Sequence, residues 1–219
     1  MGREFIRLFD HWAKDYDQTV QGYDPEYKAV FLDYDMILRA IVDQVQGNVL
    51  EFGVGTGNLT AKIYAANHRI FGVEPSKEMR KQAKLKVPQV TIYDGDFLKY
   101  PKFDCQIDTI VSSYAFHHLT DTEKSQAILA YSRILPLGGR IIFADTAFAT
   151  KKAREEAIRK AEKMQYFNLA EDLKTEYYPL LHELEQAFTQ AGFKIEFKRL
   201  NDFVWLMAAE KVREVEVID

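Results

Sequence analysis

The stretch from Val49 to Gly57, which reads VLEFGVGTG, has the residue types and spacing of a loop that cradles an anionic group. Gly53, Gly55 and Gly57 stand at alternate positions and let the backbone turn sharply between a buried strand and a helix beginning near Asn58. The free N–H groups at a helix N-terminus favour a carboxylate or a phosphate. The loop therefore predicts an anionic ligand.

The glycine spacing separates two kinds of ligand loop. The dinucleotide fingerprint GxGxxG also follows a strand and opens a helix. Here the residues from Gly53 to Gly57 read GxGxG, and Asn58 stands where GxGxxG has its last glycine. With Glu51 two residues before the first glycine, the stretch resembles motif I of the class I S-adenosylmethionine-dependent methyltransferases. A nucleotide-binding Rossmann variant and a purely structural glycine turn remain alternatives.

That resemblance implies a cofactor, S-adenosylmethionine, and a set of residues that bind it. Motif I corresponds to Glu51, Gly53, Gly55 and Gly57. The end of the next predicted strand, in RIFGVEPS, presents Glu74, whose carboxylate can accept hydrogen bonds from both ribose hydroxyls. NAD-binding proteins place an acid at the same point, so this residue supports an adenosine ligand more than it identifies the chemistry.

The third predicted strand end separates the two ligands better. Asp96 and Phe97, in YDGDFL, resemble the methyltransferase pattern in which an Asp receives the adenine amino group and the next residue borders the ring. Met79 resembles the apolar residue that packs on the other face of the adenine. A turn role for Asp96 and a core role for Met79 are the alternatives.

The fourth predicted strand leads into SYAFHHL, which resembles the segment beside the transferable methyl group in this family. The resemblance makes Ser113 a neighbour of the cofactor and Tyr114 and His117 the candidate catalytic residues. A histidine, with an ordinary pKa near 6.5, could accept a proton from a hydroxyl or an amine. We interpret His118 as structural, and Asp145, at the end of the fifth strand, as either an acceptor neighbour or a turn cap.

The aromatic residues near the N-terminus resemble a lid. Phe9, Trp12 and Tyr16 stand at helical spacing in LFDHWAKDYD, and the resemblance implies that Tyr16 covers the cofactor. MGREF and the stretch from LFDHWAKDYD to GYDPEY together resemble the YrrT family of class I methyltransferases. That family is named for its resemblance to methyltransferases, so its name does not identify a methyl acceptor. The turn LPLGGR resembles the family's LKPGG turn, with the proline displaced.

Composition limits the classes of partner. The chain has 219 residues, 47% of them hydrophobic, which suits one large α/β domain. A formal charge of −4 argues against broad binding to nucleic acid, which usually requires a clustered basic surface. We interpret the lysines at 77, 81, 84 and 86 as one solvated face of a helix. We expect a small-molecule methyl acceptor, no membrane contact and no metal. The oligomeric state is left open.

The single cysteine indicates a compartment. Cys105 cannot form an internal disulfide, which favours a reducing cytosol, and we interpret the residue as a bystander. The N-terminal residues are charged throughout and lack the apolar region of a signal peptide, and no apolar run reaches the length of a membrane span. The expected location is cytoplasmic.

Short apolar runs alternate with helical periodicity through the middle of the chain, as in parallel strands joined by crossover helices. Strands are predicted at 48–52, 69–73, 90–93, 107–112 and 140–144. A helix is predicted within 26–46, a second after the capping-box pair Thr120 and Glu123, and a third after the N-cap Ser76. The predicted fold is α/β and Rossmann-like, with a seven-stranded, mostly parallel sheet covered by helices on both faces.

After the core we predict a charged helix at 151–163, a helix at 180–191 ended by Gly192, and a hairpin of 193–200 with 203–209. The single domain is then divided into a lid and helix at 1–46, a cofactor-binding core at 47–146, a helical lid insertion at 147–180 and a C-terminal helix and hairpin at 181–219. Within the insertion, Arg154, Tyr166, Tyr177 and Tyr178 are candidate lid residues, with helix surface as the simpler interpretation.

The function predicted from these patterns is in-line methyl transfer from S-adenosylmethionine to a small molecule. Its catalysis would consist of alignment and exclusion of water, because the donor is already activated. Two alternatives stay open: a non-catalytic or regulatory protein that binds the same cofactor on the same fold, and an NAD-dependent oxidoreductase.

Overall fold

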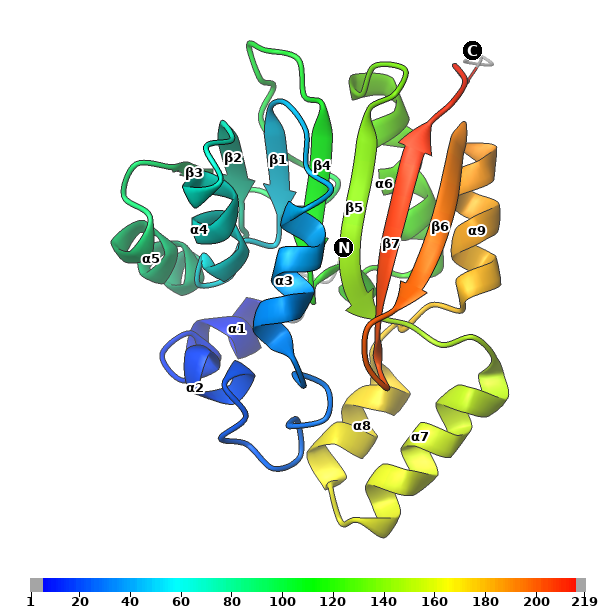
Figure 1. Ribbon diagram of the computed structural model, residues 1–219. Helices are drawn as coiled ribbons and strands as arrows, with labels where there is room; N and C mark the ends of the chain where they lie inside the picture. The colour runs from blue at the N-terminus through cyan, green and yellow to red at the C-terminus, as the bar shows by residue number, and fades with distance from the viewer. Residues whose placement is uncertain (1–5, 216–219) are drawn as a thin grey trace.

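A seven-stranded sheet in the order β3-β2-β1-β4-β5-β7-β6 forms the centre of the molecule (Figure 1). The structure is a computed structural model and describes residues 6–215, so the opening MGREF lies outside the described residues. Five strands are parallel, and β7 runs antiparallel to both β5 and β6. This confirms the predicted fold class. The strands are β1 Val49–Phe52, β2 Ile70–Val73, β3 Thr91–Tyr93, β4 Thr109–Ser113, β5 Arg140–Thr146, β6 Phe193–Arg199 and β7 Val204–Lys211.

The strand order reverses between β1 and β4, which are neighbours although β2 and β3 separate them in the chain. The chain leaves β1 toward one face of the sheet and leaves β4 toward the other. A crevice opens at the carboxyl ends of strands at such a switch point, where α/β proteins bind ligands. The predicted site residues between 51 and 118 belong to β1, to the end of β4, to α5 Lys77–Lys86, to η2 Phe116–His118, or to the loops that follow β1 to β4.

Helices cover both faces of the sheet, and four more lie at the carboxyl ends of its parallel strands (Figure 1). One face carries α3 Tyr34–Val42, α4 Asn58–Ala65 and α5 Lys77–Lys86, and the other carries α6 Asp121–Ile134 and α9 Leu181–Gln190. The strand ends face α1 Ile6–Trp12, α2 Tyr16–Val20, α7 Lys151–Lys163 and α8 Phe167–Thr175.

The sheet divides the core into two halves, because successive side chains of a strand point to opposite faces. In β4, Val111 packs with the half that includes α3, and Ile110 packs with the half that includes α6. Both Ile110 and Val111 are fully buried. The near-continuous apolar runs of the central strands follow from this two-sided burial.

Most predicted elements are confirmed to within two residues, one prediction needs correction, and one helix was not predicted. The helix predicted within 26–46 is confined to α3, because the chain runs through turns up to Asp33, which has a left-handed φ of 60°. The stretch 165–178, to which no helix was assigned from the sequence, contains α8. Among residues 6–215, the structure has no helix long and apolar enough to span a membrane.

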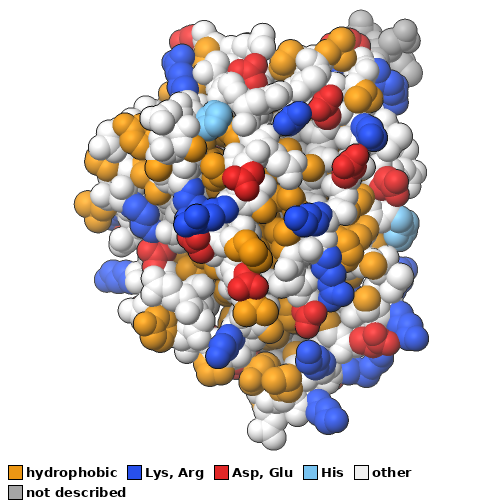
Figure 2. Space-filling view, in the orientation of Figure 1, with side chains coloured by type: hydrophobic (Ala, Val, Ile, Leu, Met, Phe, Trp, Pro, Cys, Tyr) orange, Lys and Arg blue, Asp and Glu red, His pale blue; other side chains and the backbone are white. Residues whose placement is uncertain are grey.

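Charged side chains of both signs alternate over the face seen in Figure 2, in keeping with the small formal charge of −4. The lysine face of α5 is exposed as predicted at Lys77, Lys81 and Lys84. Lys86 is exposed as well, and its Nζ lies 2.8 Å from the Asp17 carboxylate, so it also joins α5 to the N-terminal segment.

The N-terminus of α6 allows a stability test. Thr120 Oγ1 accepts a hydrogen bond from the Glu123 N–H, and the Glu123 carboxylate accepts one from the Thr120 N–H, which confirms the predicted capping box. Thr120→Ala should therefore lower the free energy of unfolding in urea by about 0.5 to 2 kcal/mol. Ser125→Ala, on the same helix but exposed, should change it by less than about 0.5 kcal/mol. Equal effects would argue against the cap.

Candidate active site

Two adjoining cavities lie at the carboxyl ends of the parallel strands. The first is lined by eight of the predicted site residues: Tyr16, Gly53, Gly55, Glu74, Asp96, Phe97, Ser113 and Tyr114. The second has a volume of about 490 Å³ and is lined by residues from the N-terminal segment, from the end of β5 and from α8. Four residues line both cavities: Phe9, Tyr16, Tyr114 and His118. The structure thus gathers most of the predicted set into one place.

The glycine loop is shaped by steric limits at two of its positions. Gly53 has a φ of +68°, and a Cβ there would lie 2.6 Å from the Cβ of Ala115. Gly57 has a φ of +86°, and a Cβ there would lie 3.2 Å from the Cα of Ala83 in α5. A side chain at either position would be strained and crowded. These contacts bring the loop close to the segment after β4 and close to α5.

Glu74 binds the glycine loop from the end of β2. Its carboxylate accepts hydrogen bonds from the N–H of Gly55, at 2.9 Å, and from the N–H of Ser76, at 2.8 Å. Burial raises the pKa of Glu74 to about 7, against the lowering effect of these two donors. The acid therefore lies in the wall of the first cavity with lone pairs left for further donors.

Glu51 lies in β1 behind the loop and is fully buried. One carboxyl oxygen accepts a hydrogen bond from Thr60 Oγ1 at 2.6 Å, and the other, Oε1, has no hydrogen-bond partner among the described residues. Burial raises its pKa to about 8. A buried oxygen without a partner is costly, so a donor supplied by a ligand or water would stabilise this site.

Asp96 and Phe97, which the sequence predicted to border an adenine, both line the first cavity. The turn role weighed for Asp96 is also present, because its Oδ1 accepts hydrogen bonds from the backbone N–H groups of Leu98 and Lys99, at 2.9 and 2.8 Å. Met79 likewise combines both interpretations, since it is buried in α5 and lines the cavity. Turn and cavity roles therefore coincide at this strand end.

Tyr114 has a left-handed backbone at the end of β4. Its φ is 51°, which is strained for a bulky side chain, and its ring is buried against Phe31 at a centroid distance of 4.9 Å. The Tyr114 N–H donates to the carbonyl of Ala144 in β5. Strain of this kind is retained at functional sites. Here the left-handed backbone places the Tyr114 ring where it lines both cavities.

His117 is held by two carboxylates from different parts of the chain. Its Nδ1 lies 2.6 Å from Asp145 Oδ1, and its Nε2 lies 3.3 Å from Glu176 Oε2. Burial alone would lower the pKa of His117, but the charge of Asp145 and the contacts with both acids raise it to about 10. A general-base role would thus require His117 to lose a firmly held proton first.

The neighbours of His117 have displaced pKa values as well. Burial would raise the pKa of Glu176, but the hydrogen bond and charge of His117 lower it to about 2. Burial and the positive charge of His117 lower the pKa of His118 to about 3, so this imidazole is neutral. Burial would raise the pKa of Asp145, but the charge and hydrogen bond of His117, together with the N–H of Thr146, lower it.

Sequence reasoning missed Glu176 and the pairing of Asp145 with His117. Glu176 follows α8 in a segment without a motif, and its position depends on Arg154, which donates to the carbonyls of Leu173 and Glu176. Arg154 therefore joins α7 to the end of α8, which differs from the helix-surface interpretation made from sequence. The acidic and aromatic composition of 165–178 was the available signal.

The N-terminal segment is joined to α8 across the second cavity. The carboxylate of Glu26 accepts hydrogen bonds from the N–H groups of Asn168 and Leu169, in the first turn of α8. Tyr27 donates a hydrogen bond to Asp172 in the same helix. An acid at a helix N-terminus is stabilised by the free N–H groups and the helix dipole. These contacts close one side of the cavity.

The same segment is also joined to the glycine loop and to the N-cap of α5. Asp17 accepts hydrogen bonds from Thr56 Oγ1, at 2.6 Å, and from the Asn58 side chain, at 3.0 Å, and it pairs with Lys86. Asp10 accepts one from Ser76 Oγ at 2.6 Å. The N-terminal segment therefore lies over both cavities.

Comparison with known proteins identifies the family. The chain is 55% identical to "Uncharacterized methyltransferase YrrT" of Bacillus subtilis, over 96% of this chain and 100% of that one. It is 54% identical to an uncharacterized methyltransferase of Bacillus pumilus, over 96% and 99%. The chain belongs to the YrrT family of methyltransferases. The family description "Methyltransferase domain" also matches residues 49–139.

The fold agrees with this membership. Magnesium protoporphyrin IX methyltransferase from Synechocystis, solved with S-adenosylhomocysteine, superposes with a TM-score of 0.71 at 15% identity, covering 95% of this chain and 97% of that one. The YrrT-family chain is an S-adenosylmethionine-dependent methyltransferase. The NAD-dependent alternative and the non-catalytic one, left open by the sequence, are not supported by these findings.

The His117 and Asp145 pair yields a pH-dependent prediction. The raised pKa of His117 means that the pair stabilises the fold fully below about pH 6.5, the unfolded value, and loses this effect as pH rises through about 10. Asp145→Asn should lower the free energy of unfolding by about 3 kcal/mol near pH 6. The loss should shrink toward pH 10.

Urea unfolding between pH 6 and pH 10 measures this dependence. Asp202→Asn, which removes an exposed ion pair with Arg199, is the matched control and should cost less than about 1 kcal/mol at every pH. A loss at Asp145→Asn that stays constant over this range would contradict the interpretation.

Proposed function

We propose that this methyltransferase acts on a small-molecule acceptor, with S-adenosylmethionine in the first cavity and the acceptor in the second. The observation that carries the proposal is that the two cavities adjoin along Phe9, Tyr16, Tyr114 and His118. In-line transfer needs donor and acceptor in contact along one axis within a site that excludes water. From here on the first is called the cofactor cavity and the second the acceptor cavity.

The residues of the cofactor cavity fit this donor. Gly53, Gly55 and Gly57 would accommodate its methionine part, and the unpartnered Oε1 of Glu51 offers a buried acceptor behind them. The Glu74 carboxylate would accept from the ribose hydroxyls, since a carboxylate has lone pairs beyond the two that Gly55 and Ser76 occupy.

The remaining walls would hold the adenine and the reacting centre. Asp96 and Phe97 would border the adenine, opposite Met79, and Ser113 would lie near the sulfonium. Tyr16 would cover the cofactor from the N-terminal segment. When bound, S-adenosylmethionine supplies an activated methyl group, so the protein needs to orient the acceptor and exclude water.

The acceptor cavity has the size and composition of a small-molecule site. Its 490 Å³ lies within the range of about 300 to 1,000 Å³ that is typical of ligand pockets. Aromatic rings form much of its wall, including Trp12, Tyr27 and Phe31, and acids from α8 supply its polar groups. A cavity of this size with aromatic walls admits a small molecule more readily than a folded macromolecule.

The proposal assigns a task to each part of the chain. Residues 47–146 would hold the cofactor, 1–46 and 147–180 would form the walls over the acceptor, and 181–219 would complete the sheet. Phe148 and Leu180 form a β-bridge, so the two ends of the insertion that contains α7 and α8 lie side by side. An insertion of this kind can vary its contacts with the acceptor without disturbing the sheet.

Tyr114 and His117 would position the acceptor beside the methyl group. The Tyr114 ring lines both cavities, and the protonated His117, whose two ring nitrogens face Asp145 and Glu176, places a positive charge in the wall of the acceptor cavity. A thiolate, a neutral amine or a carboxylate needs no further base from the protein, because its lone pair is already available. An alcohol would need His117 in its neutral form.

Glu74 provides the test of the cofactor site. Glu74→Ala should weaken binding of S-adenosylhomocysteine in calorimetric titration about 10- to 100-fold, the loss expected for one or two hydrogen bonds to a charged group. Glu78→Ala, on the exposed side of α5, is the matched control and should bind as the wild type does. Wild-type affinity in the Glu74 variant, with its fold verified by circular dichroism, would remove Glu74 from the site.

An acceptor screen tests the small-molecule assignment. Release of S-adenosylhomocysteine should be stimulated by at least one class among small thiols, amines, carboxylates and phenols. Transfer RNA and unfolded protein serve as the macromolecular comparison. Turnover with a macromolecule but with none of the small molecules would overturn the assignment, because the acceptor cavity could then not be the site of transfer.

A further inference from the structure

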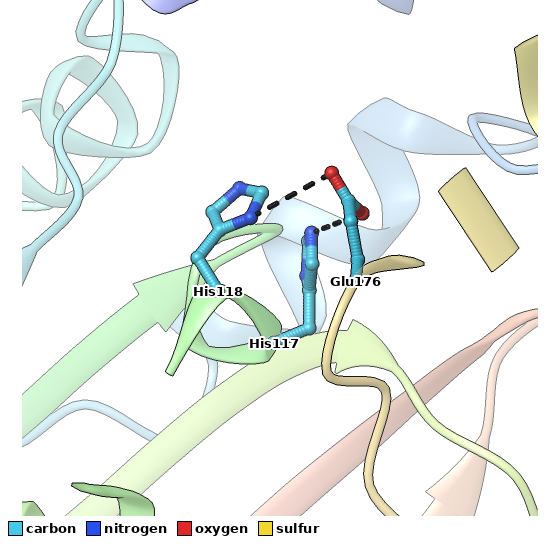
Figure 3. Close-up of side chains that lie close together, drawn as sticks. All are labelled: His117, His118 and Glu176. Atoms are coloured by element: carbon cyan, nitrogen blue, oxygen red, sulfur yellow. Dashed lines mark ion pairs between the residues drawn. The ribbon is translucent and has the colours of Figure 1, made fainter. Parts of the chain in front are cut away.

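We propose that His117, His118 and Glu176 form a binding site for a divalent transition-metal ion in the wall of the acceptor cavity. The two histidines are consecutive residues of η2, and Glu176 follows α8, so the site forms only when the insertion packs on the sheet. Figure 3 shows the three side chains converging from these two segments. Sequence spacing alone did not predict a metal, because the carboxylate comes from a distant segment.

The distances between the candidate ligand atoms are close to those between the ligand atoms around one metal ion. His117 Nε2 lies 3.3 Å from Glu176 Oε2, and His118 Nδ1 lies 3.7 Å from Glu176 Oε1. One ligand atom from each of the three residues can be chosen so that all lie within 4.8 Å of one another. Bonds of about 2.0 to 2.2 Å around a tetrahedral zinc ion separate neighbouring ligand atoms by roughly 3.3 to 3.5 Å. Small side-chain movements would therefore complete the set.

Asp145 orients the first of these ligands. Its Oδ1 lies 2.6 Å from His117 Nδ1, and its Oδ2 accepts a hydrogen bond from the His117 backbone N–H at 3.0 Å. Metal-binding histidines almost always donate their second ring N–H to a carboxylate or carbonyl, which fixes the tautomer. With Nδ1 directed at Asp145, the Nε2 atom of His117 faces Glu176. Asp145 is thus a positioning residue.

The donor atoms and their surroundings select the kind of cation. Two imidazole nitrogens and one carboxylate suit zinc, iron, cobalt or nickel, whereas magnesium and calcium prefer oxygen alone. All three residues line the acceptor cavity, so a fourth coordination position would face it. Catalytic metal sites have this composition of three protein ligands and one open position. That a bound ion would orient the acceptor rests on the proposed function, whereas binding itself does not.

A competing arrangement uses the same atoms without a metal. A hydrogen on His117 Nε2 can lie between the ring and Glu176, making the group an ion-pair network that joins η2 to the end of α8. A cation would replace that hydrogen. The two arrangements differ in whether the protein takes up metal, which can be measured directly.

The experiment titrates metal-free protein, prepared with a chelator, with Zn²⁺ and separately with Co²⁺. The expected result is one equivalent bound per chain, with the intense visible bands that Co²⁺ shows in a low-symmetry nitrogen and oxygen site. His118→Ala and Glu176→Gln should each weaken Zn²⁺ binding about 100-fold or more, and Asp145→Asn by about 10- to 100-fold.

Two control variants keep the test specific. His182→Ala removes an exposed histidine on α9, and Glu171→Gln removes an acid that lines the same cavity outside the three residues. Both should bind Zn²⁺ as the wild type does. Each variant is first compared with the wild type by circular dichroism, and the Co²⁺ spectrum of the wild type needs no variant at all.

Three outcomes would overturn the proposal: no binding of either ion by the wild type, a Co²⁺ spectrum of the hydrated ion, or equal losses in the control variants. Titration of the metal-free protein with S-adenosylhomocysteine separates this failure from that of the proposed function. If the nucleoside binds while Zn²⁺ does not, the ion-pair arrangement is correct and the cofactor site stands.

Discussion

The reversal of strand order between β1 and β4 is the constraint on which the rest of this structure depends. Because the chain leaves these two strands toward opposite faces, their carboxyl ends carry no common crossover helix and a crevice remains between them. The glycine loop after β1 and the strained Tyr114 after β4 form its two edges. Packing of Ala115 against Gly53 holds those edges at a fixed spacing.

The crevice concentrates ionisable groups in a dry environment. Glu51 and Glu74 lie behind the glycine loop, and both have raised pKa values because they are buried. Around His117 the effect is the opposite: the pKa values of Asp145 and Glu176 are lowered, because the positive charge of His117 lies beside them and keeps both acids ionised. The carboxylates beside the glycine loop can thus gain further hydrogen-bond donors, whereas those beside His117 are already charged and paired.

Sequence patterns predicted the parts of the site that depend on local geometry. The glycine loop, Glu74 and Asp96 each follow a strand at a fixed interval, so their positions in a parallel sheet could be inferred from spacing. Glu176 could not be inferred in this way, because it reaches His117 only through the packing of α7 and α8. The helix before β1 was predicted too long for a related reason. Its apolar periodicity continues through Val30, but that residue packs from a turn.

The contacts of the N-terminal segment have a consequence for how the two ligands bind. Asp17 joins this segment to the glycine loop, and Glu26 joins it to the first turn of α8. Any movement of the segment that opens one cavity therefore changes the walls of the other. Under the proposed function, donor and acceptor share this segment as a wall, so their binding equilibria are linked and each ligand alters the affinity for the other by the same factor. A donor that holds the segment against the glycine loop would thereby also hold one wall of the acceptor cavity in place.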